Sequence, residues 1–321
     1  MSEEPLRIVV FGYHTIGYRC LKELLDRGEE VHAVVTHQDD PREHVWFESV
    51  AELAQAAGVP VLSPNTPNTP AFISHIAALR PDLILSCYYR RLLCQELLAL
   101  PRLGAINLHG SLLPKYRGRA PVNWVLANGE THTGATLHYM TEQADAGDII
   151  AQRAVDIAFE DTALTLFEKV AQAAVELFRE TFPLIKAGMA PRTPQDSAQA
   201  TYFGGRTPDD GRIDWGRPAL GLYNLVRAVT TPYPGAFTYC CGKKLYIWSA
   251  RLIQDDAGER WPPGTILDAR HGGCLVATGA GHLLLTQVQL QGEEVITGDT
   301  WFRSGGVAAG TRLGEEQACG C

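Results

Sequence analysis

The chain has 321 residues, which is about twice the usual domain size and allows two domains of moderate size. Hydrophobic residues at 45% and charged residues at 20% are typical of a globular protein and exclude collagen-like, coiled-coil and disordered classes. The 28 Lys and Arg against 36 Asp and Glu give a net charge of −8, which argues against a protein that binds a nucleic-acid backbone. Small anionic substrates stay compatible with this charge through local Arg clusters.

Targeting, disulfide and metal signals are absent from the sequence pattern. The chain starts with acidic residues before a short apolar run, which does not match a secretory signal, and no apolar run approaches the roughly 18 residues of a membrane span. The eight cysteines include no CxxC pair, and the histidines lack metal-ligand spacing. We therefore expect a cytoplasmic protein with no membrane insertion, no disulfide framework and no metal.

Strand-like and helix-like segments alternate along the first part of the chain. The apolar runs and the helical spacings between them follow each other in the order of an open parallel sheet with helices on both faces. We expect ligands beyond the carboxyl ends of these strands. The expected strands cover 6–12, 31–36, 60–62, 82–86 and 104–108, and the expected helices cover 17–27, 49–57, 70–79 and 95–100.

The pattern changes after a long amphipathic helix at 164–186. A helix at 220–228 is followed by short strands parted by Gly and Pro, which indicates a small OB-like β-barrel. The fold class expected is thus α/β, with an open, mostly parallel Rossmann-like sheet followed by that barrel. We expect an N-terminal catalytic domain over 1–190, a connector over 191–204, an OB-like domain over 205–304 and a loose tail over 305–321, with barrel strands at 235–241, 244–248, 264–268, 274–278 and 283–290.

The most informative stretch follows the strand at 104–108. With Leu108 between them, Asn107 and His109 point to the same side of an extended segment. An amide donor can hold a developing oxyanion and an imidazole can move a proton near neutral pH, a combination that suits acyl transfer to a nitrogen or oxygen nucleophile. Asp145, in a turn of small residues, offers a carboxylate that would orient the imidazole and favour its protonated form.

Each of these features also has a structural explanation. An Asn-x-His pair is often a capped turn, and Lys115, Arg117 and Arg119 can form a solvated basic loop. His138 alternates like a strand side chain, so we expect a structural role for it. The turn at 12–17 lacks the middle glycine of a dinucleotide fingerprint, and we expect no dinucleotide there.

Together, Asn107, His109 and Asp145 resemble the hallmark of the 10-formyltetrahydrofolate-dependent formyltransferases, which is Asn-x-His with a downstream Asp in a DxG turn. The resemblance covers about 300 residues. It is closest to family members that formylate UDP-4-amino-4-deoxy-L-arabinose, and it is carried by NLHGSLLPKYRGRAPVNWVLANGETHTGATLH at 107–138, SCYYRRLL at 86–93, GGRTPDD at 204–210 and VRAVTTPYPGAF at 226–237.

The resemblance implies transfer of a formyl group from the co-substrate 10-formyltetrahydrofolate to the 4-amine of that sugar nucleotide. The product, a 4-formamido sugar nucleotide, would serve lipid A modification and polymyxin resistance. By the same resemblance, Asn107 would stabilise the tetrahedral oxyanion, His109 would act as acid and base, and Asp145 would favour the protonated form of His109.

Binding residues are also implied. The folate would contact a mostly apolar region with few polar groups, and the uridine diphosphate would need a cation and a stacking surface. The resemblance implies small-molecule partners and no nucleic acid, in a homo-oligomer or in a longer protein with a decarboxylase domain. The implied folate contacts are Arg91, Leu92, Leu93, Arg119, Thr141, Glu142, Gln143, Ala144 and Asp145, and the implied sugar-nucleotide contacts are Tyr13, His14, Arg206 and Tyr233.

Other functions share the same three residues. A methionyl-tRNA formyltransferase would need a basic surface, whereas this chain has a short first loop at 12–17 and a net charge of −8. A deformylase would activate water on the same folate. Other nucleotide-linked amino sugars are formylated by relatives, and a binding module with an inactive site would bind ligand without turnover.

Overall fold

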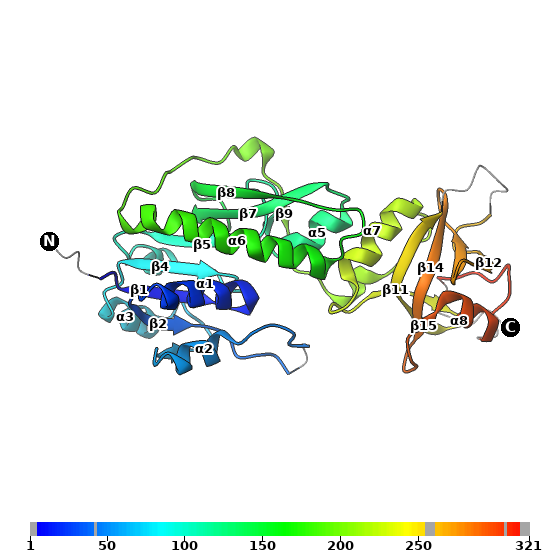
Figure 1. Cartoon of the computed structure of the whole chain (residues 1–321), viewed down its shortest axis with the longest axis horizontal. Helices are drawn as coiled ribbons and strands as arrows, with labels where there is room; N and C mark the ends of the chain where they lie inside the picture. Colours follow the sequence, from blue (N-terminus) through cyan, green and yellow to red (C-terminus); the bar gives the residue numbers. More distant parts are fainter. Residues whose placement is uncertain (1–4, 42–43, 254–260, 305–306, 315–321) are drawn as a thin grey trace. The chain divides into compact units, whose positions relative to one another are not determined.

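The computed structural model describes residues 5–41, 44–253, 261–304 and 307–314. They form two compact units (Figure 1). The first unit takes residues up to 121 together with 132–156 and 167–204, and the second takes the rest of the chain. Residues 122–131 and 157–166 pack with the second unit although they lie inside the range expected for the N-terminal domain.

A seven-stranded sheet forms the centre of the first unit, in the order β3-β2-β1-β4-β5-β7-β8. Continuous apolar runs such as IVVFG suit strands that helices cover on both faces, and β1 and β4 are buried along their whole length. The first five strands pair in parallel and the last two antiparallel, which confirms the mostly parallel sheet. The strands are β1 (Ile8–Gly12), β2 (Val31–Val35), β3 (Val61–Leu62), β4 (Leu83–Cys87), β5 (Ala105–His109), β7 (His132–Tyr139) and β8 (Ile149–Asp156).

Helices cover both faces of this sheet, as expected. On one face α1 (His14–Asp26) and α6 (Ala163–Lys186) lie side by side (Figure 1), joined by the ion pairs Arg19–Glu168 and Arg179–Glu23. On the other face α3 (Pro70–Ala78) and α4 (Gln95–Leu98) bury Ile76 and Leu97 against β1 and β4. The short helix α2 (Val50–Ala56) packs beside α1.

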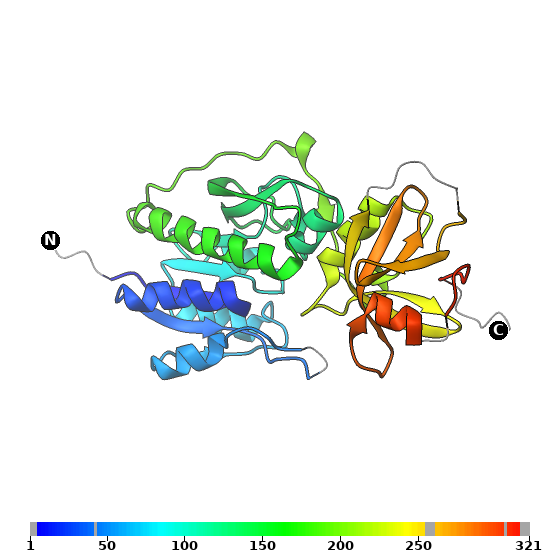
Figure 2. The same cartoon turned by 45° about the vertical axis from the view of Figure 1, so that its right-hand side comes forward.

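The second unit is built on an antiparallel sheet in the order β10-β11-β14-β13-β12 (Figure 2). This sheet confirms a separate β domain at the C-terminal side of the chain. Its strand β11 runs to Ile253, well beyond the expected end of that strand. The elements are α5 (Pro121–Ala127), η2 (Pro208–Gly211), α7 (Ala219–Val229), β10 (Ala236–Cys240), β11 (Lys243–Ile253), β12 (Ile266–Arg270), β13 (Gly273–Ala277), β14 (His282–Leu290), β15 (Ile296–Thr297) and α8 (Gly298–Ser304).

The expectation of a loose tail is wrong for residues 307–314. The Leu313 side chain is only 4% exposed, and its backbone N–H donates to the Gly264 carbonyl ahead of β12. The next residue, Gly314, donates to the Tyr239 carbonyl in β10. The segment is therefore held against the sheet by these backbone hydrogen bonds and by the burial of Leu313. The tail residues 305–306 and 315–321 lie outside the described residues.

The segment expected as a connector is a structural part of the first unit. Thr193 exchanges two backbone hydrogen bonds with Ile149 at the start of β8. After the short helix η1 (Ser197–Gln199), strand β9 (Tyr202–Phe203) pairs in parallel with β6 (Arg117–Gly118). Residues 193–203 thus pack on the loops that follow β5 and β7.

No helix in the described part of the chain is long and apolar enough to cross a membrane. The cysteines that the structure describes are free.

Candidate active site

The end of β5 places two of the expected catalytic side chains. Asn107 and His109 alternate with Leu108 on this strand, and Asn107 is paired with His138 of the antiparallel neighbour β7. Directly opposed residues of two antiparallel strands carry their side chains on the same face of the sheet. The strand pairing therefore brings a second histidine beside the amide of Asn107.

The carboxylate of Asp145 joins these side chains. Its Oδ1 lies 3.6 Å from Nδ1 of His109, 3.4 Å from Nε2 of His138 and 3.3 Å from Nδ2 of Asn107. Its Oδ2 accepts a hydrogen bond of 2.8 Å from the backbone N–H of Gly118. The structure thus brings together all three residues expected to be catalytic, although Asp145 is 36 residues beyond His109 in the sequence.

Charge keeps Asp145 ionised. Burial by itself would raise its pKa, but the charge of His109, the hydrogen bond and charge of His138 and the Gly118 N–H outweigh burial. The pKa of Asp145 lies well below its usual range as a result. The site therefore holds a permanent negative charge beside two imidazoles.

Both ring nitrogens of His109 face acceptors. The side chain is 6% exposed, and its Nε2 lies 2.8 Å from the Tyr116 carbonyl oxygen, which can only accept. Nε2 therefore carries a hydrogen while Nδ1 faces Asp145. A protonated His109 satisfies both acceptors, so this geometry suits a residue that gains and gives up a proton.

His138, expected to be structural, lies inside the site. It is 1% exposed, and its Nδ1 lies 2.8 Å from the Tyr139 carbonyl oxygen, so this nitrogen is the donor. Its Nε2 lies 3.1 Å from Nδ2 of Asn107 and 3.4 Å from Asp145 Oδ1, so it accepts from the amide in the neutral ring and donates to the carboxylate in the protonated ring. His138 therefore orients the amide of Asn107. The sequence signals only a strand position at 138, because the β5–β7 register that brings the two residues together is not written in it.

Two glycines allow the close approach around Asp145. A Cβ on Gly147 would overlap the Tyr139 carbonyl oxygen, and a Cβ on Gly118 would overlap the Phe203 carbonyl oxygen. Gly118 also has a φ of +98°, which favours glycine. Asp145 itself has a φ of +53°, a left-handed conformation that is uncommon outside glycine.

The expected folate contacts differ in exposure. Arg91 and Leu92 are exposed, Leu92 by 59%, and Arg119 is exposed with its Nη2 donating to the Arg90 carbonyl at 3.0 Å. Leu93 is only 3% exposed and belongs to the core between β4 and α4. In the turn after β7, Thr141, Glu142 and Gln143 are exposed and Ala144 is half-buried.

Tyr13 and His14 lie at the carboxyl end of β1 in a group of aromatic rings. The Tyr13 hydroxyl donates to Asp39 Oδ1 at 2.7 Å, and the His14 ring stacks on Phe47 with centroids 3.9 Å apart. Burial, and then the charge of Arg90, lower the pKa of His14 to about 3. Its Nδ1 has no hydrogen-bond partner among the described residues. His14 is therefore a half-buried imidazole that is neutral at neutral pH.

Arg206 and Tyr233 belong to the second unit, whereas Asn107, His109 and Asp145 belong to the first. The guanidinium carbon of Arg206 lies 4.5 Å from the Trp124 ring centroid, and Nη2 donates to the Asp210 carbonyl at 3.0 Å. Burial raises the pKa of Tyr233 to about 12, although a hydrogen bond with Asn123 opposes the rise.

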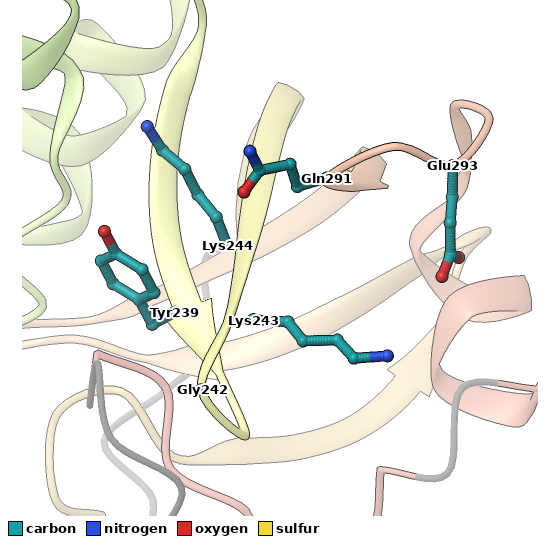
Figure 3. Close-up of a pocket in the computed structure, with 6 residues that line it drawn as sticks. All are labelled: Tyr239, Gly242, Lys243, Lys244, Gln291 and Glu293. Carbon is teal, nitrogen blue, oxygen red and sulfur yellow. The ribbon is translucent and has the colours of Figure 1, made fainter.

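A polar hollow of about 380 Å³ lies at the β10–β11 turn of the second unit (Figure 3). The side chains of Lys243 and Lys244 point in different directions in it (Figure 3), and the Lys244 ammonium sits 3.7 Å from the Phe237 ring centroid. Because these cations do not converge, the hollow is a poorer candidate than the end of β5. Among the residues that the structure describes, no group of three or more His, Cys, Asp or Glu could hold a metal ion.

Comparison with known families decides the class of the protein. Residues 6–182 match the family model "Formyl transferase", and residues 206–306 match "Formyl transferase, C-terminal domain". The chain belongs to the formyl transferase family. It is therefore an enzyme of formyl transfer, with the residues around Asp145 inside the N-terminal match.

Solved structures share the fold of this formyl transferase. HypX from Aquifex aeolicus is 21% identical with a TM-score of 0.62; the match covers 95% of this chain but 49% of HypX, so the chain spans about half the length of HypX. The N-formyltransferase from Helicobacter canadensis, in complex with folinic acid and dTDP-3-aminofucose, is 18% identical over 87% of this chain and 98% of that chain, with a TM-score of 0.68. A 4-N formyltransferase from Francisella tularensis is 22% identical over 72% and 91%, with a TM-score of 0.59.

Proposed function

We propose that this formyl transferase moves the formyl group of 10-formyltetrahydrofolate to the 4-amine of UDP-4-amino-4-deoxy-L-arabinose. The product would be the 4-formamido sugar nucleotide, made for lipid A modification and polymyxin resistance. The observation that carries the proposal is the single ionised carboxylate of Asp145, which joins the amide of Asn107 to the imidazole of His109. A nucleotide-linked sugar amine is also the substrate class suggested by the dTDP-3-aminofucose bound to the Helicobacter canadensis enzyme.

The amide of Asn107 would hold the negative charge that develops on the formyl oxygen. In the free protein its Nδ2 faces both His138 and Asp145, at 3.1 Å and 3.3 Å. Rotation of the side chain would turn this amide toward the oxyanion, which would replace one of these two acceptors. A preorganised donor of this kind typically contributes about 3 to 4 kcal/mol to lowering the barrier.

His109 would carry the proton. The co-substrate supplies the formyl group, attached to a nitrogen that needs a proton on leaving. His109 would take the proton from the attacking amine at Nδ1, because Nε2 keeps its hydrogen bond to the Tyr116 carbonyl, and would give that proton to the leaving nitrogen. The ionised Asp145 would balance the charge of the ring at each transfer. The burial of His109 excludes bulk water from this exchange.

The folate would bind beside the loop that follows β4, with Leu92 and the turn 141–145 against the pterin. Three arginines gather near this loop. The backbone N–H of Arg90 donates to Nε2 of His37 at 3.0 Å, and Nη2 of Arg119 donates to the Arg90 carbonyl at 3.0 Å. Burial, and then the charges of Arg90, Arg91 and Arg119, lower the pKa of His37 to about 4. Such a cation cluster suits the carboxylates of a folate tail. The residues present therefore fit the co-substrate.

The proposed contacts of the sugar nucleotide are Tyr13, His14, Arg206 and Tyr233. The Arg206 guanidinium offers a charge for the diphosphate. Burial lowers the pKa of Arg206, but a guanidinium stays charged at neutral pH.

A substrate panel tests the choice of sugar. Initial rates of formyl transfer are measured with UDP-4-amino-4-deoxy-L-arabinose and with thymidine-linked 3-amino and 4-amino hexoses, each at limiting concentration. We expect the uridine-linked pentose to give the highest kcat/KM. Equal values across the panel would refute the pentose assignment and leave only the class of amino-sugar nucleotides.

A further inference from the structure

Gln195 lies in the segment 191–204 and has no role in the mechanism above, yet its side chain is fully engaged. Its Nε2 donates to the backbone carbonyls of Asp145 and Gly147, at 2.8 Å and 2.7 Å. Its Oε1 accepts from Nε and Nη2 of Arg117, at 3.2 Å and 2.7 Å. Both N–H groups and the oxygen of this amide are therefore directed to the loops around the candidate site.

These contacts hold both sides of the Asp145 carboxylate. On one side Gln195 donates a hydrogen bond to the backbone of the turn that bears Asp145. On the other side it binds Arg117, which is 7% exposed, and the next residue, Gly118, donates its N–H to Asp145 Oδ2. One side chain thus connects the residue that carries the carboxylate with the strand that orients it.

The Asp145 turn needs such support. Asp145 adopts a left-handed φ of +53°, a conformation that is uncommon for a residue other than glycine. The preceding side chains Thr141, Glu142 and Gln143 are exposed and bury nothing in the core. Hydrogen bonds to the turn carbonyls are therefore a main source of its rigidity.

We propose that Gln195 is a positioning residue, which fixes the Asp145 carboxylate against His109. The inference rests on the proposed function, because it gives the fixed carboxylate a part in proton transfer. Without the Gln195 N–H donors the turn relaxes, and the 3.6 Å contact between Asp145 and Nδ1 of His109 is lost in part of the population. Misplacement of a catalytic group by about 1 Å can cost about 100-fold in rate.

Three variants test this role. Gln195→Ala removes every contact, whereas Gln195→Glu keeps an oxygen acceptor for Arg117 and loses both N–H donors. Gln199→Ala is the matched control, because Gln199 is exposed in the same segment and its Nε2 donates to Asp196 rather than to the Asp145 turn. We expect kcat about 10- to 100-fold lower in both Gln195 variants, KM for the amino-sugar nucleotide within about twofold of wild type, and wild-type kinetics for Gln199→Ala.

Recovery of the wild-type kcat in Gln195→Glu would show that an acceptor for Arg117 is sufficient and would overturn the proposal. An increase in KM with an unchanged kcat would overturn it as well. Thermal unfolding identifies a variant that does not fold. Gln195→Glu retains an oxygen acceptor for the buried Arg117, so it keeps the test valid if Gln195→Ala fails to fold.

A second readout separates this proposal from the proposed function. In protein with ¹⁵N-labelled histidine at acidic pH, the Nδ1–H of His109 that faces Asp145 gives a proton signal protected from solvent exchange. It is assigned as the signal that is lost both in His109→Gln and in Asp145→Asn, whereas the Nε2–H bonded to the Tyr116 carbonyl is lost only in His109→Gln. We expect this signal in wild type and in Gln199→Ala, and its loss in both Gln195 variants. Retention of the signal in those variants overturns the positioning role, whatever amine the enzyme formylates.

Discussion

At the scale of single residues, the chemistry of the site depends on one oxygen atom. Asp145 Oδ1 faces Asn107, His109 and His138, and its charge is retained because those neighbours offset the effect of burial on its pKa. Removing the carboxylate would leave two buried imidazoles without their shared counter-charge. The carboxylate therefore matters both for the orientation of His109 and for its charge.

Substitution of either member of this pair should stop turnover. We expect His109→Ala and Asp145→Asn to lower kcat by about 100-fold or more, because the proton relay loses its carrier or its counter-charge. Asn keeps the volume of Asp145, and Ala is smaller than His at position 109. Urea unfolding should therefore show a folded protein for both variants. A kcat close to wild type in either variant would contradict the proposed roles.

The stability of the protein should depend on His14 at mildly acidic pH. Its pKa is about 3 in the folded protein against 6.5 as the ordinary value, so in this range the unfolded chain binds a proton that the folded chain does not. The free energy of unfolding therefore falls as pH drops below 6.5, by up to about 1.4 kcal/mol per pH unit from this group. His37, whose pKa is lowered to about 4, acts in the same direction.

Urea unfolding at pH 7, 6 and 5 measures this dependence. His14→Phe keeps a ring in the aromatic group and should show a shallower loss of stability than wild type. His75→Phe, at an exposed position of α3, is the control and should run parallel to wild type. Identical slopes for His14→Phe and wild type would show that His14 does not resist protonation in the folded protein.

At the scale of elements, most strands of the first unit follow from the sequence because parallel strands covered on both faces are continuous apolar runs. The start of α1 at His14 does not follow, since that residue has an unusual φ of +64°. The roles of His138 and Gln195 also depend on contacts between segments distant in the chain, which periodicity cannot supply. A sequence motif indicates Asn107, His109 and Asp145 as candidate catalytic residues. Their supporting residues, such as His138, become apparent only from the strand register.

The short β6–β9 pair is an element on which the site depends. Gly118 and Gly28 both have positive φ. A Cβ on Gly118 would meet the Phe203 carbonyl oxygen, whereas a Cβ on Gly28 would meet no atom of the described residues within 4 Å. We expect Gly28→Ala to cost about 1 kcal/mol of stability and leave kcat unchanged. Gly118→Ala should cost more and lower kcat at least tenfold, because β6 must shift and withdraw its N–H from Asp145.

Urea unfolding and initial rates on the two glycine variants check this difference. Equal stability losses and equal rates in both variants would show that the β6–β9 pairing does not position Asp145.

At the scale of the whole molecule, the two family matches cover 6–182 and 206–306, and Gln195 lies between them. The segment that joins the two matched ranges therefore carries structure for the site of the first unit. The net charge of −8 and the one-residue connection at Tyr13 between β1 and α1 favour a small anionic substrate over transfer RNA. Arg90, Arg91, Arg119 and Arg206 supply positive charge locally within that acidic chain.

The central claim is formyl transfer from 10-formyltetrahydrofolate to the amine of a uridine-linked sugar. The most direct measurement follows tetrahydrofolate release from that donor in three parallel reactions, with UDP-4-amino-4-deoxy-L-arabinose, with charged initiator tRNA, and with buffer alone. We predict release only with the sugar nucleotide, in step with formation of the formamido product. Release with the tRNA would contradict the charge argument, and release in buffer alone would identify a hydrolase.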